Sequence, residues 1–95
     1  MNIKELHTET KAVSTKPLFK GELGSVLALQ IMKDEQFPEH ITKTPALLLC
    51  VKGHVFFRNV NGFEEELQAG DYINVEPMIR HWVDAVADSD LVLIK

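Results

Sequence analysis

Turn-forming residues interrupt this chain so often that long helices are excluded. Five glycines and four prolines are spread between residues 17 and 77. They leave no uninterrupted segment with a 3.6-residue apolar period beyond the N-terminus. The apolar runs between them are short, as strands are. We therefore expect an antiparallel β-sandwich or β-barrel.

The expected strands number seven or eight. Residues 25–33 are apolar on both faces, which is typical of a strand covered on both sides. Asn61-Gly62 predicts a two-residue type I′ hairpin turn. Glutamates 64–66 are expected on a solvated edge strand without a function of their own. The other strands are expected at residues 46–51, 54–60, 63–67, 72–75, 81–87 and 91–95.

Ninety-five residues make one small domain, expected at residues 17–95. Ile3, Leu6 and Val13 are too sparse to define an amphipathic helix, so residues 1–16 are expected as an irregular arm or an exchanged edge strand. A domain of this size buries only about 60 to 65% of the surface of its unfolded chain, and a partner subunit adds stability. We therefore expect a homodimer.

Charge and cysteine content exclude several classes of protein. Ten Lys+Arg against 14 Asp+Glu give a net charge of −4 without a basic cluster, so neither nucleic acid nor a membrane is expected as a partner. The single Cys50 excludes an internal disulfide and a cysteine-rich zinc site. Residues 1–12 are too polar for a signal peptide. We expect a cytoplasmic protein.

Two histidines, His40 and His81, lie at expected turn-to-strand junctions, and the residues around them resemble those of a known family. The sequence GDYINVEPMIRHWVDA places Gly70, Asp71, Pro77 and His81 at the spacing of the second conserved motif of the cupin superfamily. Residues 38–90 as a whole resemble the two motifs of that superfamily. The resemblance implies an all-β fold, a small double-stranded β-helix (jelly-roll) barrel of short antiparallel strands. Met78 stands where the family usually has a glycine, and there it is expected to adopt a backbone angle that methionine tolerates badly.

The first cupin motif is present in outline, but two of its ligands are replaced. Family members that bind metal show His-x-His, then a glutamate, then a glycine after the next strand. Counting from His40 puts Thr42 at the second histidine, and counting back from Gly53 puts Ala46 at the glutamate. Of four family ligands, His40 and His81 therefore remain. Two histidines and a hydroxyl are a weak set for a divalent transition metal, and hydrogen bonds alone can also hold such a pair.

Strand alternation predicts which side chains point into the barrel. Cys50 is expected deep in the barrel as a small buried hydrophobe, about 13 Å along the strand from Ala46 and too far to replace a ligand. Of adjacent Phe56 and Phe57, one should face inward and one outward, and an outward aromatic set can form a subunit interface. The candidate ligand-binding residues are Thr42, Leu48, Cys50 and Val83.

These observations favour a protein that holds a small molecule in an apolar pocket with His40 and His81 at its mouth. A divalent transition metal would bind there weakly, and no reaction is assigned. The alternative is a metal-dependent enzyme of the dioxygenase or isomerase type that uses both histidines as ligands. A structural protein that has lost its site is a third hypothesis. Were the fold different, a seven-stranded sandwich would be the nearest alternative.

Overall fold

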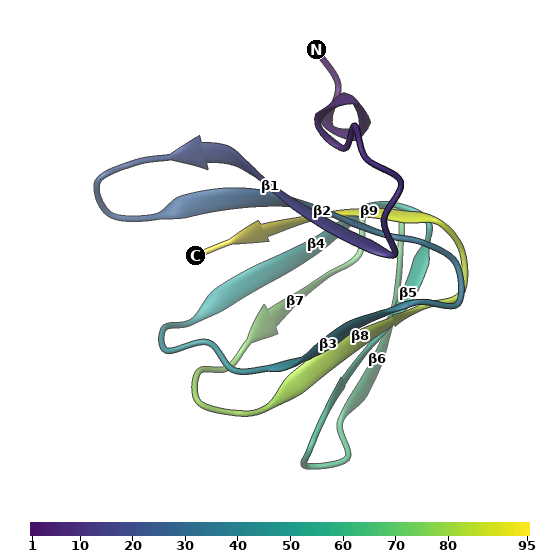
Figure 1. Ribbon diagram of the computed structural model, residues 1–95. Helices are drawn as coiled ribbons and strands as arrows, with labels where there is room; N and C mark the ends of the chain where they lie inside the picture. Colours follow the sequence, from purple (N-terminus) through teal and green to yellow (C-terminus); the bar gives the residue numbers. More distant parts are fainter.

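Two antiparallel sheets face each other in the computed structural model, which describes all 95 residues (Figure 1). One sheet, here sheet A, has the order β1-β2-β9-β4-β7, and the other, sheet B, has the order β3-β8-β5-β6. The all-β class with short antiparallel strands is confirmed. The elements are a 3₁₀ turn η1 (Ile3–Leu6), β1 (Val13–Lys20), β2 (Ser25–Ile31), β3 (Gln36–His40), β4 (Ala46–Lys52), β5 (His54–Asn59), β6 (Glu64–Gln68), β7 (Tyr72–Val75), β8 (His81–Ala85) and β9 (Ser89–Ile94).

Strand β3 was not expected from the sequence, and β1 was expected only as one alternative, an edge strand within residues 1–16. Strand β1 lies at the edge of sheet A, where it pairs only with β2, and it crosses the expected boundary between residues 16 and 17. Strand β3 lies at the edge of sheet B and contains Pro38. Proline removes a backbone donor and is tolerated on edge strands. Pro38 argued against a strand in the sequence, but it is compatible with the edge position of β3.

The turn between β5 and β6 differs from the expected type I′ turn. Gly62 N donates to Asn59 O, and Asn59 N donates to Phe63 O, which encloses a three-residue loop. Gly62 has a φ of 84°, whereas Asn61 is not left-handed. The Asn59 side chain accepts from the N–H groups of Asn61 and Phe63. The type I′ prediction was wrong, because a three-residue loop needs only one left-handed residue, the glycine.

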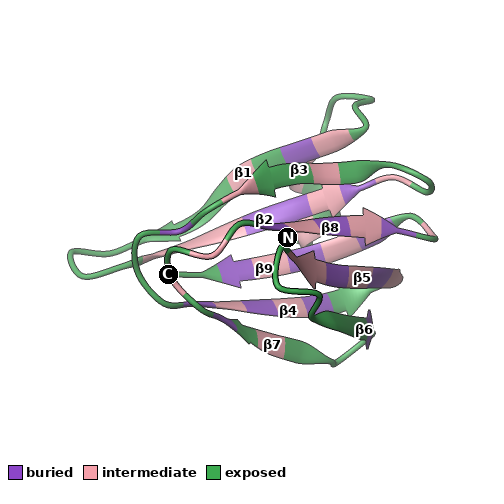
Figure 2. Ribbon diagram, turned by 90° about the horizontal axis from the view of Figure 1, so that it is seen from below, coloured by how far each residue is buried: buried purple, intermediate pink, exposed green.

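The core fills the space between the sheets, where buried residues alternate with half-buried ones along β4, β5, β8 and β9 (Figure 2). Phe57 faces inward and is 4% exposed, whereas Phe56 faces outward beneath the Arg58 guanidinium. No helix of the structure is long and apolar enough to cross a membrane. The largest fully buried side chains are Ile31, Leu67, Leu91, Val55, Val83 and Cys50. The centre of the barrel is therefore filled by side chains.

Candidate functional site

A tight turn before β7 anchors the strand that leads to His81. Gly70 has a φ of 92°, and its N–H donates to Cys50 O over 2.7 Å. Asp71 accepts from Gln68 N through its carboxylate over 2.7 Å and from Cys50 N through its carbonyl over 2.8 Å. Because glycine adopts a positive φ at little cost and aspartate caps the turn, the pair fastens this turn to β4.

The loop between β7 and β8 contains the strained residue that the sequence predicted. Met78 has a φ of 64°, a left-handed conformation that costs a residue with a Cβ atom about 1 to 2 kcal/mol. Its N–H donates to the carbonyl of Thr42 over 2.8 Å. That bond connects the loop of the second motif to the loop of the first. The expectation of an unfavourable backbone angle at Met78 is confirmed.

His40 and His81 face each other across adjacent strands. Their Cα atoms are register partners between β3 and β8, and their Nε2 atoms are 3.0 Å apart. His40 Nδ1 lies 2.9 Å from Pro38 O, and His81 Nδ1 lies 2.9 Å from Ile79 O. The two rings form one unit, which we call the histidine pair.

The hydrogen bonds of the histidine pair determine where its protons lie. Carbonyl oxygens only accept, so Nδ1 of both His40 and His81 must carry the hydrogen. In the neutral rings both Nε2 atoms are then acceptors, and they face each other at 3.0 Å. Two lone pairs at this distance repel unless something electropositive lies between them. The gap suits one shared proton or one cation.

Burial works against protonation of His81. Its ring is 4% exposed and stacks on Phe57 with 5.3 Å between ring centroids. Desolvation lowers the pKa of His81, the bond to the Ile79 carbonyl opposes this, and nearby His40 adds to the lowering. A proton in the gap is therefore disfavoured by the surroundings of His81, which leaves the gap better suited to a cation or to a donor group of a ligand.

The side chains around the pair supply only part of a metal-ligand set. Two nitrogens that both bind one ion at about 2.1 Å are about 3 Å apart in neighbouring coordination positions. Thr42 and Ala46, at the two replaced ligand positions, are each 7% exposed, and Thr42 Oγ1 has no hydrogen-bond partner. No group of three or more His, Cys, Asp and Glu is placed to hold a metal.

The structure separates the four candidate pocket residues. Leu48 and Val83 lie directly beneath the histidine pair, around a void of only about 10 Å³. Thr42 lies on the far side of His40, in a larger pocket. Cys50 is fully buried and lines none of these spaces. Burial, with a smaller contribution from Asp71, raises the pKa of its thiol. Cys50 lies deep in the barrel, as expected.

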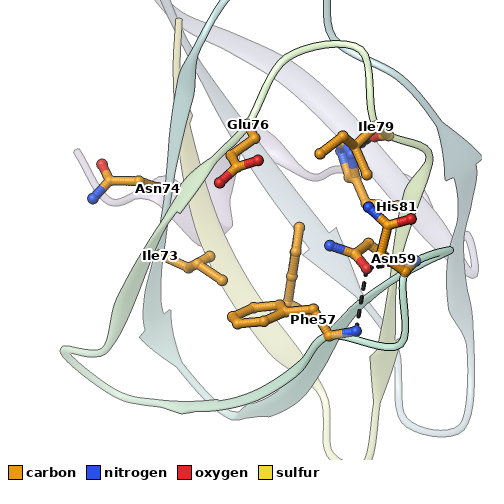
Figure 3. A pocket seen from close by; sticks show the side chains of 9 residues that line it. Phe57, Asn59, Ile73, Asn74, Glu76, Ile79 and His81 are labelled. Carbon is orange, nitrogen blue, oxygen red and sulfur yellow. Dashed lines mark hydrogen bonds between the residues drawn. The ribbon is translucent and has the colours of Figure 1, made fainter.

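Two open pockets lie on either side of the histidine pair. The first, which we call the Glu76 pocket, has a volume of about 260 Å³. In Figure 3 the carboxylate of Glu76 points into it, whereas Asn74 points away. Sequence reasoning missed this pocket because its residues come from β5, β7, β8 and two loops that no single motif joins. It is lined by Phe57, Asn59, Asn61, Phe63, Ile73, Asn74, Glu76, Ile79 and His81.

The second, which we call the Lys43 pocket, has a volume of about 510 Å³. It lies on the His40 side of the pair, among β1, β2, β3, β9 and the loop before β4. Sequence reasoning found Thr42 and His40 here through the first motif. No sequence pattern identifies the other lining residues, because they come together only through β1 and through the pairing of β2 with β9. It is lined by Thr15, Ser25, Leu27, Leu29, Phe37, His40, Ile41, Thr42, Lys43, Thr44, Leu93 and Lys95.

Comparisons with known proteins agree with the fold. Residues 28–94 match the family model described as Cupin domain. No curated protein is similar enough to match the sequence. A cupin superfamily protein from Desulfitobacterium hafniense is 13% identical and has a TM-score of 0.85, and the match covers 98% of this chain and 84% of that one.

Two further solved structures share the fold. An uncharacterized conserved protein with a double-stranded β-helix domain from Klebsiella pneumoniae is 13% identical, with a TM-score of 0.85 and coverage of 99% of this chain and 85% of that one. A conserved protein of unknown function from Streptococcus pyogenes is 15% identical, with a TM-score of 0.78 and coverage of 90% and 75%. At these identities the likeness shows the fold alone. Because the family match spans more than half of the chain, this protein belongs to the cupin family.

Proposed function

We propose that this cupin binds a small molecule at the mouth of its barrel, and that the histidine pair holds a divalent transition metal ion weakly. The observation that carries the proposal is the 3.0 Å approach of two Nε2 atoms whose rings are both fixed by carbonyl acceptors at Nδ1. An arrangement that places two lone pairs together is costly without a partner, which supports a bound cation or donor. The two flanking pockets supply space for a ligand.

Metal titration of the untagged protein tests the proposal. We expect calorimetry with Ni²⁺ or Zn²⁺ to detect one weak site per chain, because two imidazoles supply only part of a coordination shell. His40→Ala and His81→Ala should each abolish the site. His54→Ala is the matched control, since His54 lies on the surface beside Glu66 with 2.6 Å between Nε2 and Oε2. Equal binding by the wild type and both pair variants, or loss of binding in His54→Ala, would contradict the proposal.

A homodimer is the second part of the proposal, and the outer face of sheet A supports it. Strand alternation turns a set of half-buried or exposed apolar side chains outward across β2, β9 and β4, where an antiparallel sheet normally presents polar residues to water. A second copy of the chain could cover this face symmetrically. On sheet B, by contrast, the outward Phe56 is already covered by Arg58. The outward residues are Val26, Leu47, Leu49, Val92 and Ile94.

Light scattering after size exclusion tests the oligomer. We expect the mass of a dimer for the wild type and of a monomer for Leu49→Glu. Gln68→Glu, at an exposed position on sheet B, is the control and should remain a dimer. A monomeric wild type at micromolar concentration would refute this part of the proposal. A cytoplasmic location stays a prediction, supported by the unpaired thiol of Cys50.

A further inference from the structure

The Lys43 pocket combines an apolar interior with a polar, basic rim. Five apolar residues line it: Leu27, Leu29, Phe37, Ile41 and Leu93. The polar part of the lining consists of His40 and of Thr15, Ser25, Thr42, Lys43, Thr44 and Lys95. A volume of about 510 Å³ is within the range of small-molecule sites. The pocket therefore suits an amphipathic ligand, with an apolar body and a polar head.

The charge of the lining indicates the sign of that head. Lys43 lines the pocket, no aspartate or glutamate does, and Lys43 takes part in no ion pair. The Glu76 pocket, across the histidine pair, has the opposite character: its charged lining residue is a carboxylate, again without an ion-pair partner. An anion is therefore favoured beside Lys43 and disfavoured beside Glu76.

Thr42 provides an independent observation. It lines the Lys43 pocket beside His40, is 7% exposed, and its Oγ1 is buried without a hydrogen-bond partner. A buried hydroxyl without a partner costs about 1 to 3 kcal/mol. A rotation of the Thr42 side chain that brings Oγ1 to a ligand oxygen in the pocket would remove that cost.

We propose that the Lys43 pocket binds a small fatty or aryl carboxylate. Its apolar body lies on Leu29 and Phe37, and its carboxylate accepts from Lys43 and from the hydroxyl of Thr42. Charge-assisted hydrogen bonds of this kind are about twice as strong as neutral ones. The inference names a ligand class for the small-molecule site of the proposed function, but it does not require a metal at the histidine pair.

Octanoate is the probe, titrated below micelle-forming concentrations into metal-free protein and followed by calorimetry and NMR. We expect saturable binding at one site, at least tenfold weaker binding of octanamide, and no binding of octylamine. Lys43→Glu should weaken octanoate at least tenfold, and Thr42→Val, which removes the hydroxyl at constant shape, should weaken it severalfold. Lys33→Glu changes the net charge equally at an exposed position beyond the opposite end of β2 and should bind as the wild type does.

Three results would overturn the inference: no saturable binding of octanoate, equal binding by Lys43→Glu and Lys33→Glu, or equal affinity for octanoate and octylamine. Circular dichroism of each variant verifies folding, and Thr42→Val provides a second measurement that leaves the charge unchanged. A protein that binds Ni²⁺ through the histidine pair but not octanoate refutes this inference alone. A protein that binds octanoate but no metal refutes the metal part of the proposed function alone.

Discussion

The two cupin motifs of this chain differ in what they retain. In the second motif Gly70, Asp71, Pro77 and His81 are all present, and the turn at Gly70 and Asp71 has the geometry that these two residues favour, although Met78 in the following loop is strained. The first motif retains its frame, but two ligand positions hold side chains that cannot donate strongly to a metal. The difference shows that the backbone of this site can keep its shape when metal ligands are replaced. Backbone hydrogen bonds and turn residues, not the ligands, hold that shape.

The hydrogen bond from Met78 N to Thr42 O shows how the two motifs stay together without a metal. It joins their loops through backbone atoms only, so replacing the side chain at residue 42 leaves it intact. The register pairing of His40 with His81 adds a second connection. The mouth of the barrel therefore keeps its shape although half of the family's ligand set is gone.

The largest expected effect comes from the glycine of the first motif. In Gly53→Ala the new Cβ would lie 2.6 Å from Asp88 O and closer still to Ser89 Oγ, at a φ of 103°. In Gly70→Ala the φ is 92°, but no atom lies within 4 Å of the new Cβ. We expect losses in the free energy of unfolding of about 3 kcal/mol or more for Gly53→Ala and about 1 to 2 kcal/mol for Gly70→Ala.

Urea unfolding of both variants measures this difference. Equal losses would mean that left-handed strain alone matters at Gly53 and that the contact with β9 relaxes without cost. The frame of the first motif would then be less constrained than its geometry indicates.

Restoring the two replaced ligand positions of the first motif would remove the difference between the two motifs. Thr42→His with Ala46→Glu places an imidazole and a carboxylate at the two replaced ligand positions, where both native side chains are 7% exposed. With a fuller ligand set, we expect the affinity for Ni²⁺ or Zn²⁺ to rise by at least about tenfold. The matched control is the same double variant with His81→Ala, which should lose the gain. An unchanged affinity in a folded double variant would show that these positions do not face the histidine pair.

The strain at Met78 predicts a smaller effect. Met78→Gly relieves the left-handed conformation, while glycine makes the unfolded chain more flexible, so we expect a net stabilisation of about 0.5 kcal/mol. Met78→Ala keeps the strain and should change stability little, because the side chain is 66% exposed. Thermal unfolding separates the two variants. Destabilisation of Met78→Gly would mean that the methionine side chain makes contacts that outweigh the strain.

The smallest expected change in stability concerns His7, which lies in neither motif. It shows how burial changes the pKa of a histidine outside the histidine pair. Its Nδ1 lies 2.8 Å from Ser14 Oγ, and its Nε2 is buried without a partner. Burial lowers its pKa, Asp90 opposes this, and Lys16 adds to it. The unfolded chain therefore binds a proton more readily, and the contribution of His7 to stability is lost as the pH falls through about 6.5.

The measurement is urea unfolding between pH 7.5 and 5 for the wild type and for His7→Gln. We expect a shallower pH dependence in the variant. Identical profiles would show that the N-terminal segment detaches before the fold opens.

Prediction from sequence succeeded where one short segment carries the information. Gly70, Asp71 and His81 act through local turns and a fixed spacing, so the fold, the histidine pair and the strained Met78 could all be predicted. The Glu76 and Lys43 pockets could not, because their walls come from several strands, and the wall of the Lys43 pocket includes residues of β1 and β3. Those edge strands lack the apolar alternation that identifies a strand, since only one neighbour and part of one face constrain them.

The central claim is that two histidine Nε2 atoms converge on one electropositive partner. Long-range ¹⁵N–¹H NMR of the imidazole nitrogens, before and after one equivalent of Zn²⁺, tests it most directly. The structure predicts that His40 and His81 both carry hydrogen on Nδ1, and that both Nε2 resonances shift together on titration while His54 does not respond. A hydrogen found on Nε2 of either neutral ring, or a response at only one of the two, would contradict the account.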